Sequence, residues 1–364
     1  MLRNKKEDLN IIFLYAGANR RNLLDALLKG VAPDSSFFGL QHLKSLTAGR
    51  ADFFEPRGIY SPRIEKTVRK YVGFNASFLP ALFKIWSYDV VVSPIGIPVL
   101  LMRSLVPVKR PLWFVFNLSL TNLLKRNQGN TIKFKIIIFA LKRAAHIICL
   151  SSSQKKFLQS MGFDEEKISV VLFGVDKNFY KLDNAEVSKN YILSVGRDNG
   201  RDYETLFTAI RSIDAKFIVV CSPRNLVGIS NIPNNVEVQY DVDYLTLRDL
   251  YQNAQFVVVS SQNEEYMDGS DCSGQTVVLD AMSSSKAVIA TYRTWMDDYF
   301  TSGKECLIVP PKSPEVLKEK IMFLLKNPEK IQVLGNAARK RIELDLNSEY
   351  MAERLYAIFT KNKK

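Results

Sequence analysis

Short runs of valine, isoleucine and leucine without polar alternation recur along the chain, and they constrain its fold more than any other feature. They lie at residues 11–15, 90–93, 112–116, 147–150 and 169–172, and then at 191–195, 217–221, 236–240, 256–260, 287–291 and 306–309. Strands of a parallel sheet are buried on both faces and therefore read as near-continuous apolar runs. Helical patterns lie between several of them, at residues 205–212, 245–253, 277–283 and 314–326. This alternation predicts an α/β fold of doubly wound parallel sheets with right-handed crossovers.

The length of 364 residues predicts two domains, at about 150 residues for each. A polar stretch without apolar periodicity, residues 180–190 (YKLDNAEVSKN), separates two sets of strands. We therefore expect a Rossmann-like N-terminal domain over 1–180, a linker over 181–190 and a second Rossmann-like domain over 191–345. A C-terminal helix over 346–364 is expected to pack back on the first domain. The ligand is expected in a cleft between the domains, at the carboxyl ends of the strands.

Cysteine usage and apolar run length exclude several classes. The four cysteines form no C-x-x-C pair, which argues against a disulfide scaffold and against a cysteine-based zinc site. The longest uncharged stretch, residues 111–124, is shorter than the ~20 residues that a membrane-spanning helix needs. These features predict a protein of the reducing cytoplasm without a transmembrane helix.

The charge is concentrated in the first half. Residues 1–180 carry a net charge of +15 and residues 181–364 a net charge of −2, within a total of +13. Such asymmetry indicates a polyanionic partner for the first half. The alternative is that the basic residues only keep an apolar surface in solution. Nucleic acid is not expected, because no motif of interleaved aromatic and basic residues accompanies the charge.

Three basic and apolar runs predict contact with an anionic membrane surface. Arg63, Lys66, Arg69 and Lys70 recur at helical spacing and precede an aromatic stretch that ends near Trp86. Further runs lie at 102–110 and 133–143. Apolar side chains of this kind enter the interfacial layer while cations contact the headgroups. We expect peripheral attachment at the inner face of the plasma membrane, although the run at 133–143 also fits a core helix whose lysines reach solvent.

Two segments of the second half predict anion-binding helix starts. In the first, YILSVGRDNGRDYETLFTAI, a strand ends at Gly196 and Arg197, and Arg201 follows in a short polar loop before a helix. In the second, SGQTVVLDAMSSSKAVIAT, Ser273 and Gly274 open a helix that carries Asp280 further along. The N–H groups of a helix start and the planar guanidinium both suit phosphate oxygens. A carboxylate on the second helix suits a hydroxyl group, although a solvated surface carboxylate fits the pattern equally well.

Together these segments resemble the nucleotide-sugar domain of glycosyltransferases with the GT-B fold, family 4. The resemblance runs from about residue 168 to residue 341. It also includes KISVVLFGVDKNFY before the linker and VLGNAARKRIE near its end. It implies two Rossmann-like domains and transfer of a sugar from a nucleoside-diphosphate sugar, above all a UDP-sugar, with retention of configuration. It further implies that Arg197 and Arg201 are the catalytic cations, that the leaving phosphate accepts the acceptor's proton, and that neither a metal nor another cofactor is required.

The resemblance also implies a set of binding residues. On the donor side these are Gly17, Gly196, Val242, Asp271, Ser273, Gly274, Gln275, Thr276 and Asp280, and on the acceptor side Asn117. Gly17 belongs to a small-residue loop after the first strand, and Val242 lies in the nucleobase loop. The expected acceptor is a glycan, a lipid-linked glycan or a glycolipid of cell-surface polysaccharide synthesis.

Several positions depart from the family pattern. The family has two glutamates eight residues apart, where this chain has Cys272 and the shorter Asp280. Asp271, Glu264 or Glu265 is expected to replace the first glutamate at the donor sugar. Asn117 stands where many members have a histidine. These departures leave two alternatives, a non-catalytic GT-B module that binds a sugar nucleotide or a glycan, and a UDP-sugar epimerase on the same fold.

Overall fold

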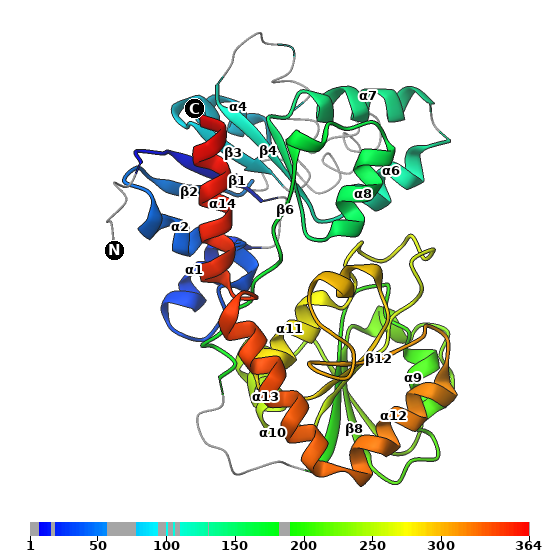
Figure 1. Ribbon diagram of the computed structural model, residues 1–364. Coiled ribbons are helices and arrows are strands. Elements are labelled where there is room, and N and C mark those ends of the chain that lie inside the picture. Colours follow the sequence, from blue (N-terminus) through cyan, green and yellow to red (C-terminus); the bar gives the residue numbers. More distant parts are fainter. Residues whose placement is uncertain are drawn as a thin grey trace. The chain divides into compact units, whose positions relative to one another are not determined.

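The computed structural model of the protein describes residues 7–15, 19–56, 78–93, 100, 105, 110–129, 131–181 and 190–363. The chain divides into two compact units, which are seen in Figure 1. Unit 1 comprises Met1–Asp25, Phe37–Leu172 and Glu349–Lys364, and unit 2 comprises Ala26–Ser36 and Phe173–Ser348. Within the described ranges, no helix has the length and apolar character needed to cross a membrane.

Unit 1 is built on a six-stranded parallel sheet in the order β2-β1-β3-β4-β5-β6. Its strands are β1 (Ile11–Leu14), β2 (Ala51–Phe54), β3 (Val90–Ser93), β4 (Leu112–Asn117), β5 (His146–Cys149) and β6 (Ile168–Val170). The helices along this part of the chain are α1 (Arg20–Leu28), α2 (Leu40–Leu46), α4 (Leu79–Lys84), α6 (Leu120–Asn127), α7 (Thr131–Lys142) and α8 (Ser152–Ser160). A 3-10 turn, η3 (Ile85–Ser87), follows α4 directly.

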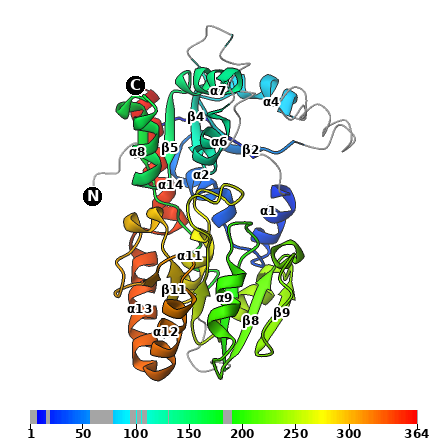
Figure 2. The ribbon, with the colours of Figure 1, turned by 90° about the vertical axis from the view of Figure 1, so that its right-hand side faces the viewer.

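Helices cover both faces of this sheet, and Figure 2 shows them in a second view. On one face, strand side chains such as Trp113 and Val115 pack in one core with Leu124, Ile137 and Leu158 of α6, α7 and α8. On the other face, Phe114 makes an edge-on ring contact of 4.7 Å with Phe359 of the C-terminal helix α14 (Ser348–Lys363). The inner strands β1, β3, β4 and β5 are therefore buried on both sides, as their apolar sequences require.

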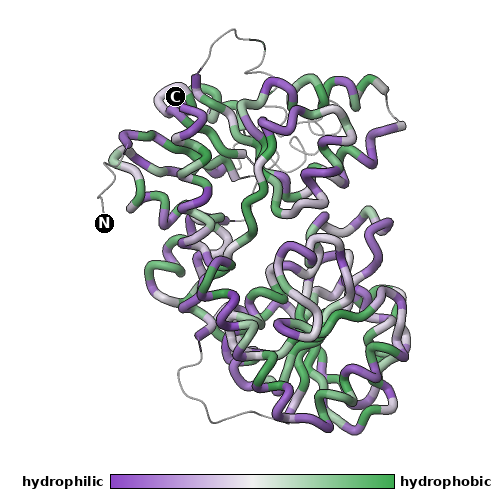
Figure 3. The backbone as a smooth tube through the Cα atoms, in the orientation of Figure 1, coloured by the Kyte–Doolittle hydropathy of each residue, from purple (hydrophilic) through white to green (hydrophobic). Residues whose placement is uncertain are grey.

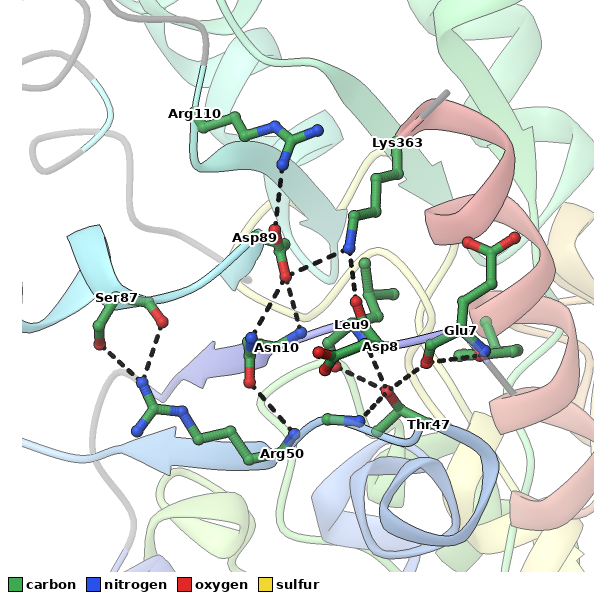
Figure 4. Close-up of polar contacts among 12 residues, drawn as sticks. Glu7, Asp8, Leu9, Asn10, Thr47, Arg50, Ser87, Asp89, Arg110 and Lys363 are labelled. Carbon is green, nitrogen blue, oxygen red and sulfur yellow. Dashed lines mark hydrogen bonds and ion pairs between the residues drawn. The ribbon is translucent and has the colours of Figure 1, made fainter. Parts of the chain in front are cut away.

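Polar contacts fix the end of α14 to unit 1 (Figure 4). The Asp89 carboxylate forms ion pairs with Lys363 at 3.5 Å and with Arg110 at 3.3 Å, and it accepts a hydrogen bond from the Asn10 backbone N–H. Lys363 also donates to the carbonyl of Asp8. Asp89 lies at the start of β3, so one carboxylate ties the amino edge of the sheet to the last turn of the chain.

Unit 2 is built on a second six-stranded parallel sheet in the order β12-β11-β10-β7-β8-β9. Its strands are β7 (Tyr191–Val195), β8 (Lys216–Cys221), β9 (Val236–Tyr240), β10 (Val257–Val259), β11 (Val288–Thr291) and β12 (Leu307–Val309). Its helices are α9 (Tyr203–Ile210), α10 (Tyr244–Asn253), α11 (Gln275–Ser283), α12 (Pro314–Lys326) and α13 (Pro328–Leu344). Figure 1 shows α9 and α12 on one side of the sheet and α10 and α11 on the other, and Figure 3 shows the hydrophobic strands at the centre of both sheets.

The predicted fold class is confirmed, because both sheets are parallel and both are covered by helices on their two faces. Each predicted apolar run overlaps a strand, and among the described strands the pattern missed only β2, whose short sequence ADFF carries Asp52 at its second position. Most of the expected linker, residues 182–189, lies outside the described residues. The expected limit at 180 falls inside unit 2, since the N–H of Phe173 already donates to the Tyr299 hydroxyl at 2.7 Å.

Candidate functional site

The strand order of unit 2 contains a point at which the winding of the chain reverses. Its first strand, β7, lies between β8 and β10, so the sheet grows first to one side of β7 and then to the other. Ligands of doubly wound sheets bind outside the carboxyl ends of the strands at such a switch point. The segments that start at Gly196 and Ser260, directly after β7 and β10, border this position.

Backbone hydrogen bonds hold these two segments together. Arg201 and Ser261 form an isolated antiparallel bridge. The Asp202 N–H donates to the Ser260 carbonyl at 3.2 Å, and the Gln262 N–H donates to the Gly200 carbonyl at 2.8 Å. The side chains after both strands are therefore presented from a fixed frame.

Arg201 is the buried cation of this frame. Its side chain is only 7% exposed, and its Nη1 donates to the Ser261 hydroxyl at 3.3 Å. Its Nε has no hydrogen-bond partner among the described residues. Burial lowers the pKa of Arg201 from its ordinary value, and nearby Tyr203 and Asp198 oppose the shift. An arginine remains protonated in such a position, so a positive charge with an unused Nε–H donor lies at the switch point.

Two glycines make room for the guanidinium. A Cβ on Gly196 would lie 1.9 Å from the Arg201 Nε, and a Cβ on Gly274 would lie 3.1 Å from its Nη1. Gly274 also has a φ of 89°, in the left-handed region that favours glycine. The sequence therefore requires glycine at both positions for Arg201 to occupy this place.

The start of helix α11 lies against the same guanidinium. Gly274 is the N-cap of the helix, and its neighbour Ser273 is buried with a hydroxyl that has no partner among the described residues. The first N–H groups of a helix lack partners within the helix and favour an anion. We call Gly196, Arg201, Ser273 and Gly274 the Arg201 site. It combines a cation, a hydroxyl and a helix start, which is the donor set that a phosphate group accepts.

Contacts with Asp198 and Gly200 hold the long β10–α11 loop, residues 260–274, against the loop after β7. The Asp198 carboxylate accepts from the N–H groups of Gly200 at 2.8 Å and of Ser270 at 3.2 Å. A Cβ on Gly269 would lie 2.8 Å from the Gly200 Cα, so two backbones touch at this point. Asp198 therefore links the loop after β7 to the loop after β10.

Arg293 holds the same loop from the other side. It is 3% exposed, and its guanidinium donates to the carbonyls of Gln262 and Asn263, both at 2.9 Å, and of Asp271 at 3.2 Å. The pattern of the sequence did not single out Arg293, Asp198, Gly200, Ser261 or Gly269. The available signal for Arg293 and Asp198 was their position just after a strand, which many surface residues share.

The acidic candidates for the donor sugar are used differently. Glu264 accepts from the backbone N–H of Thr294 at 2.7 Å and from its hydroxyl at 2.8 Å, so it caps the turn η6 (Thr294–Asp298). Glu265 is exposed and Asp271 is half-buried. The geometry thus gives Glu264 a structural task, and a sugar contact by Asp271 stays a prediction.

Asp280 lies inside unit 2 rather than on a solvated helix face. It is 6% exposed on α11, where burial raises the pKa of its carboxyl well above the usual value. The neighbouring Asp176 raises this pKa further, and the Tyr180 side chain opposes the shift. The predicted contact with a ribose hydroxyl remains a prediction. Of the other residues expected on α11, Gln275 is buried and Thr276 is exposed.

Arg197 is placed differently from Arg201. Its side chain is 60% exposed and forms an ion pair of 3.1 Å with Asp241, which directly precedes Val242. Asp243 accepts from the Thr246 N–H at 2.8 Å and caps α10. Over the residues that the structure describes, no three His, Cys, Asp or Glu side chains are grouped to hold a metal ion.

In unit 1, Asn117 has a structural role. It is fully buried at the end of β4, where its Oδ1 accepts from the N–H groups of Leu120 at 3.1 Å and Thr121 at 3.4 Å. Its Nδ2 donates to the Thr121 hydroxyl at 3.2 Å and contacts the Cys149 Sγ at 3.8 Å. Its amide is therefore engaged inside unit 1, and the predicted contact of Asn117 with an acceptor stays a prediction.

The remaining predicted residues lie outside the described ranges. They are Gly17, Arg63, Lys66, Arg69 and Lys70. The start of helix α1 already has an anion, because the Glu55 carboxylate accepts from the N–H groups of Arg20 at 2.6 Å and Arg21 at 3.3 Å. Of the predicted donor residues, the structure brings together Gly196, Arg201, Ser273 and Gly274.

Comparisons with known proteins match this picture in both units. The model of the family "Glycosyl transferases group 1" matches residues 176–341, and that of "Glycosyltransferase Family 4" matches residues 43–179. An uncharacterized glycosyltransferase of Methanocaldococcus jannaschii is 27% identical over 218 residues, which is 58% of this chain and 58% of that relative.

Solved structures show the same fold. HepE of Anabaena in complex with UDP-glucose has a TM-score of 0.71 at 12% identity, over 97% of this chain and 100% of that one. Sucrose-phosphate synthase of Thermosynechococcus elongatus has a TM-score of 0.72 at 16% identity, over 98% of this chain and 99% of that one. Two consecutive family models, one for each half, and this shared fold lead to one conclusion. The chain belongs to the GT-B glycosyltransferases of family 4.

Proposed function

We propose that the protein is a retaining glycosyltransferase that takes its sugar from a nucleoside-diphosphate sugar, specifically a UDP-sugar. The observation that carries the proposal is Arg201, a buried guanidinium with an unused Nε at the switch point of unit 2. A buried guanidinium with an unsatisfied donor is costly to a fold and is retained where a ligand supplies the partner. The ligand that this site fits is a dianionic or trianionic phosphate group.

The chemistry follows from where negative charge develops. When the bond from the sugar to the diphosphate breaks, charge accumulates on the departing phosphate oxygens. The Arg201 guanidinium, the Ser273 hydroxyl and the N–H groups at the start of α11 are fixed before the reaction begins. Donors that are already oriented stabilise the transition state without reorganisation, and each contributes about 3 kcal/mol. Arg197 reaches the diphosphate in this proposal by leaving its exposed pair with Asp241, which costs about 0–1 kcal/mol.

The retaining outcome and the independence from a metal ion belong to the same proposal. The cations of Arg197 and Arg201 take the part that a divalent ion has in other transferases. The departing phosphate accepts the proton of the acceptor hydroxyl, because the side chain of Asn117 is engaged in capping α6 and is no base. The uridine assignment is supported by the complexes of HepE with UDP-glucose and with UDP.

The acceptor and the location complete the proposal. We assign the acceptor to the class of glycans, lipid-linked glycans and glycolipids of cell-surface polysaccharides. The protein acts in the cytoplasm at the inner face of the plasma membrane. The excess of +15 in residues 1–180 supports this location.

The test is a panel of UDP- and GDP-sugars incubated with the full chain and a membrane extract as the source of acceptors. We expect nucleotide release with a UDP-sugar, and a product whose anomeric configuration, read by NMR, equals that of the donor. Arg201→Ala should lower the rate by ~100-fold or more. Arg211→Ala, which removes an exposed arginine of the same unit, should leave it unchanged. The proposal of glycosyl transfer fails if no sugar nucleotide of the panel yields nucleotide release.

Cys272 favours one second candidate, a non-catalytic module that binds a sugar nucleotide. It stands where the family's first glutamate contacts the donor sugar, and a thiol does not replace a carboxylate there. This candidate predicts binding of UDP-sugars without nucleotide release in the same panel. Hydrolytic epimerisation would instead release UDP without any acceptor.

A further inference from the structure

Helix α7 of unit 1 exposes an apolar face. Its side chains of Ile132, Ile136 and Phe139 are 75%, 45% and 43% exposed, and their spacing of four and three residues places them on one side of the helix. The other side, with Ile137 and Leu141, is buried in the core of unit 1. The alternative that residues 133–143 form a core helix therefore describes only one face of α7, because large apolar residues on the other face are exposed.

Exposed cations accompany this apolar face. Lys135, Lys142 and Arg143 are exposed, and the helix contains no acidic residue. The Arg143 guanidinium lies 4.8 Å from the centre of the Phe139 ring. Exposed apolar side chains with cations beside them suit an anionic lipid surface. The apolar side chains enter its interior and the cations pair with its headgroups.

A second exposed apolar group lies at the same end of unit 1. Phe83 of α4 is 87% exposed and Trp86 of η3 is 46% exposed, and Lys84 between them is exposed as well. Figures 1 and 2 both place α4 and α7 at this end. Tryptophan and phenylalanine are the residues that anchor proteins at the level of lipid headgroups.

We propose that α7, together with Phe83 and Trp86, docks on the surface of an anionic lipid bilayer. With 12 residues, α7 is about 18 Å long, which is too short to cross the ~30 Å apolar layer. It lies in the plane of the interface, with Ile132, Ile136 and Phe139 among the acyl chains and the cations at the headgroups. The lipid is chosen over a protein partner because the net charge of +15 is confined to residues 1–180. The proposal rests on the membrane location in the proposed function and names the surface that makes the contact, while flotation reads this contact without glycosyl transfer.

The test is flotation of the full chain with vesicles of phosphatidylcholine, with and without phosphatidylglycerol, at low salt. Two variants probe α7: Ile132→Ser/Ile136→Ser/Phe139→Ser removes the apolar face, and Lys135→Glu/Lys142→Glu/Arg143→Glu reverses the charge. Matched controls in unit 2 are Val333→Ser/Leu344→Ser, at residues 60% and 67% exposed, and Lys326→Glu/Lys330→Glu/Lys340→Glu at exposed lysines. Thermal unfolding verifies that all four variants fold.

We expect the wild type to float with the anionic vesicles and not with phosphatidylcholine alone. Each α7 variant should lower the partition coefficient by roughly tenfold or more, and the unit 2 controls should retain wild-type binding. The proposal is overturned if both α7 variants float like the wild type, if the controls lose binding equally, or if only the charge reversal has an effect. It is also overturned if the wild type ignores vesicles and forms a dimer that the Ile132/Ile136/Phe139 variant abolishes, because the face would then bind protein.

Discussion

The carboxyl edges of the two sheets carry similar polar residues, and the two units use them differently. In unit 1, the side-chain amide of Asn117 accepts hydrogen bonds from N–H groups at the start of α6. The carboxylate of Glu55 accepts them in the same way at the start of α1. In unit 2, Arg201 and Ser273 keep buried donors without partners among the described residues. Because burying an unpaired polar group costs about 1–3 kcal/mol, such groups point to a ligand. The difference shows that the position at the strand ends is not enough to identify a site.

The largest effect is expected when the Arg201 guanidinium of unit 2 is displaced from its position. Gly196→Ala places a Cβ against the Arg201 Nε, so the guanidinium must leave its position. We expect UDP affinity and transfer to fall by ~100-fold or more, since an oriented donor is lost. Calorimetry with UDP checks the affinity. Gly129→Ala, at a glycine with no atom near the added Cβ, is the control. Wild-type affinity in Gly196→Ala would show that Arg201 does not bind the nucleotide.

The second prediction removes the side-chain amide of Asn117, the corresponding polar group in unit 1. Asn117→Ala removes the cap of α6 and leaves the N–H groups of Leu120 and Thr121 without their acceptor. We expect a loss of about 1–2 kcal/mol in the free energy of unfolding, with the KM for the acceptor unchanged. Denaturant titration and steady-state kinetics separate the two effects. A raised KM with unchanged stability would place Asn117 at the acceptor after all.

The third prediction uses pH, because unit 1 also buries a titratable ring in its neutral form. Burial lowers the pKa of His146 to about 4, and the charges of Lys361 and Lys155 contribute to this shift. In the unfolded chain its pKa is about 6.5, so the folded state binds fewer protons below that pH. The free energy of unfolding should therefore decline as pH falls from about 6.5 towards 4. His146→Gln should remove this part of the decline, and an unchanged pH profile in the variant would refute it.

The smallest effect is expected at the exposed arginine of unit 2. Asp241→Asn breaks the surface ion pair of Arg197, whose partners are 60% and 56% exposed. Such pairs contribute about 0–1 kcal/mol, so the free energy of unfolding should change by less than that. Because Arg197 becomes available to the diphosphate, UDP affinity should stay equal or rise. A marked loss of affinity would mean that Asp241 itself contacts the ligand.

The sequence predicted the strands well because most of them are buried on both faces and therefore nearly uniformly apolar, whereas β9 at a sheet edge alternates valines with polar residues. It missed β2, whose Asp52 breaks that pattern. At the site, Gly196, Arg201, Ser273 and Gly274 were predicted, since they lie close to strand ends and helix starts. Arg293 and Asp198 were missed, because they act by bonding backbone groups distant in sequence. The same limit applies to the hydrogen bonds between Asn117 and the start of α6, which leave no pattern in the sequence.

The most direct test of the account is UDP binding by Arg201→Met, measured by calorimetry beside the wild type and the control Arg211→Met. The account holds that Arg201 is a buried cation kept for an anionic ligand. It predicts that Arg201→Met unfolds at a temperature no lower than the wild type, since an apolar side chain replaces a buried cation that forms no ion pair within the described part of the chain. It also predicts that UDP affinity falls by ~100-fold or more in this variant only. Equal UDP affinity in the wild type and in Arg201→Met would contradict the account.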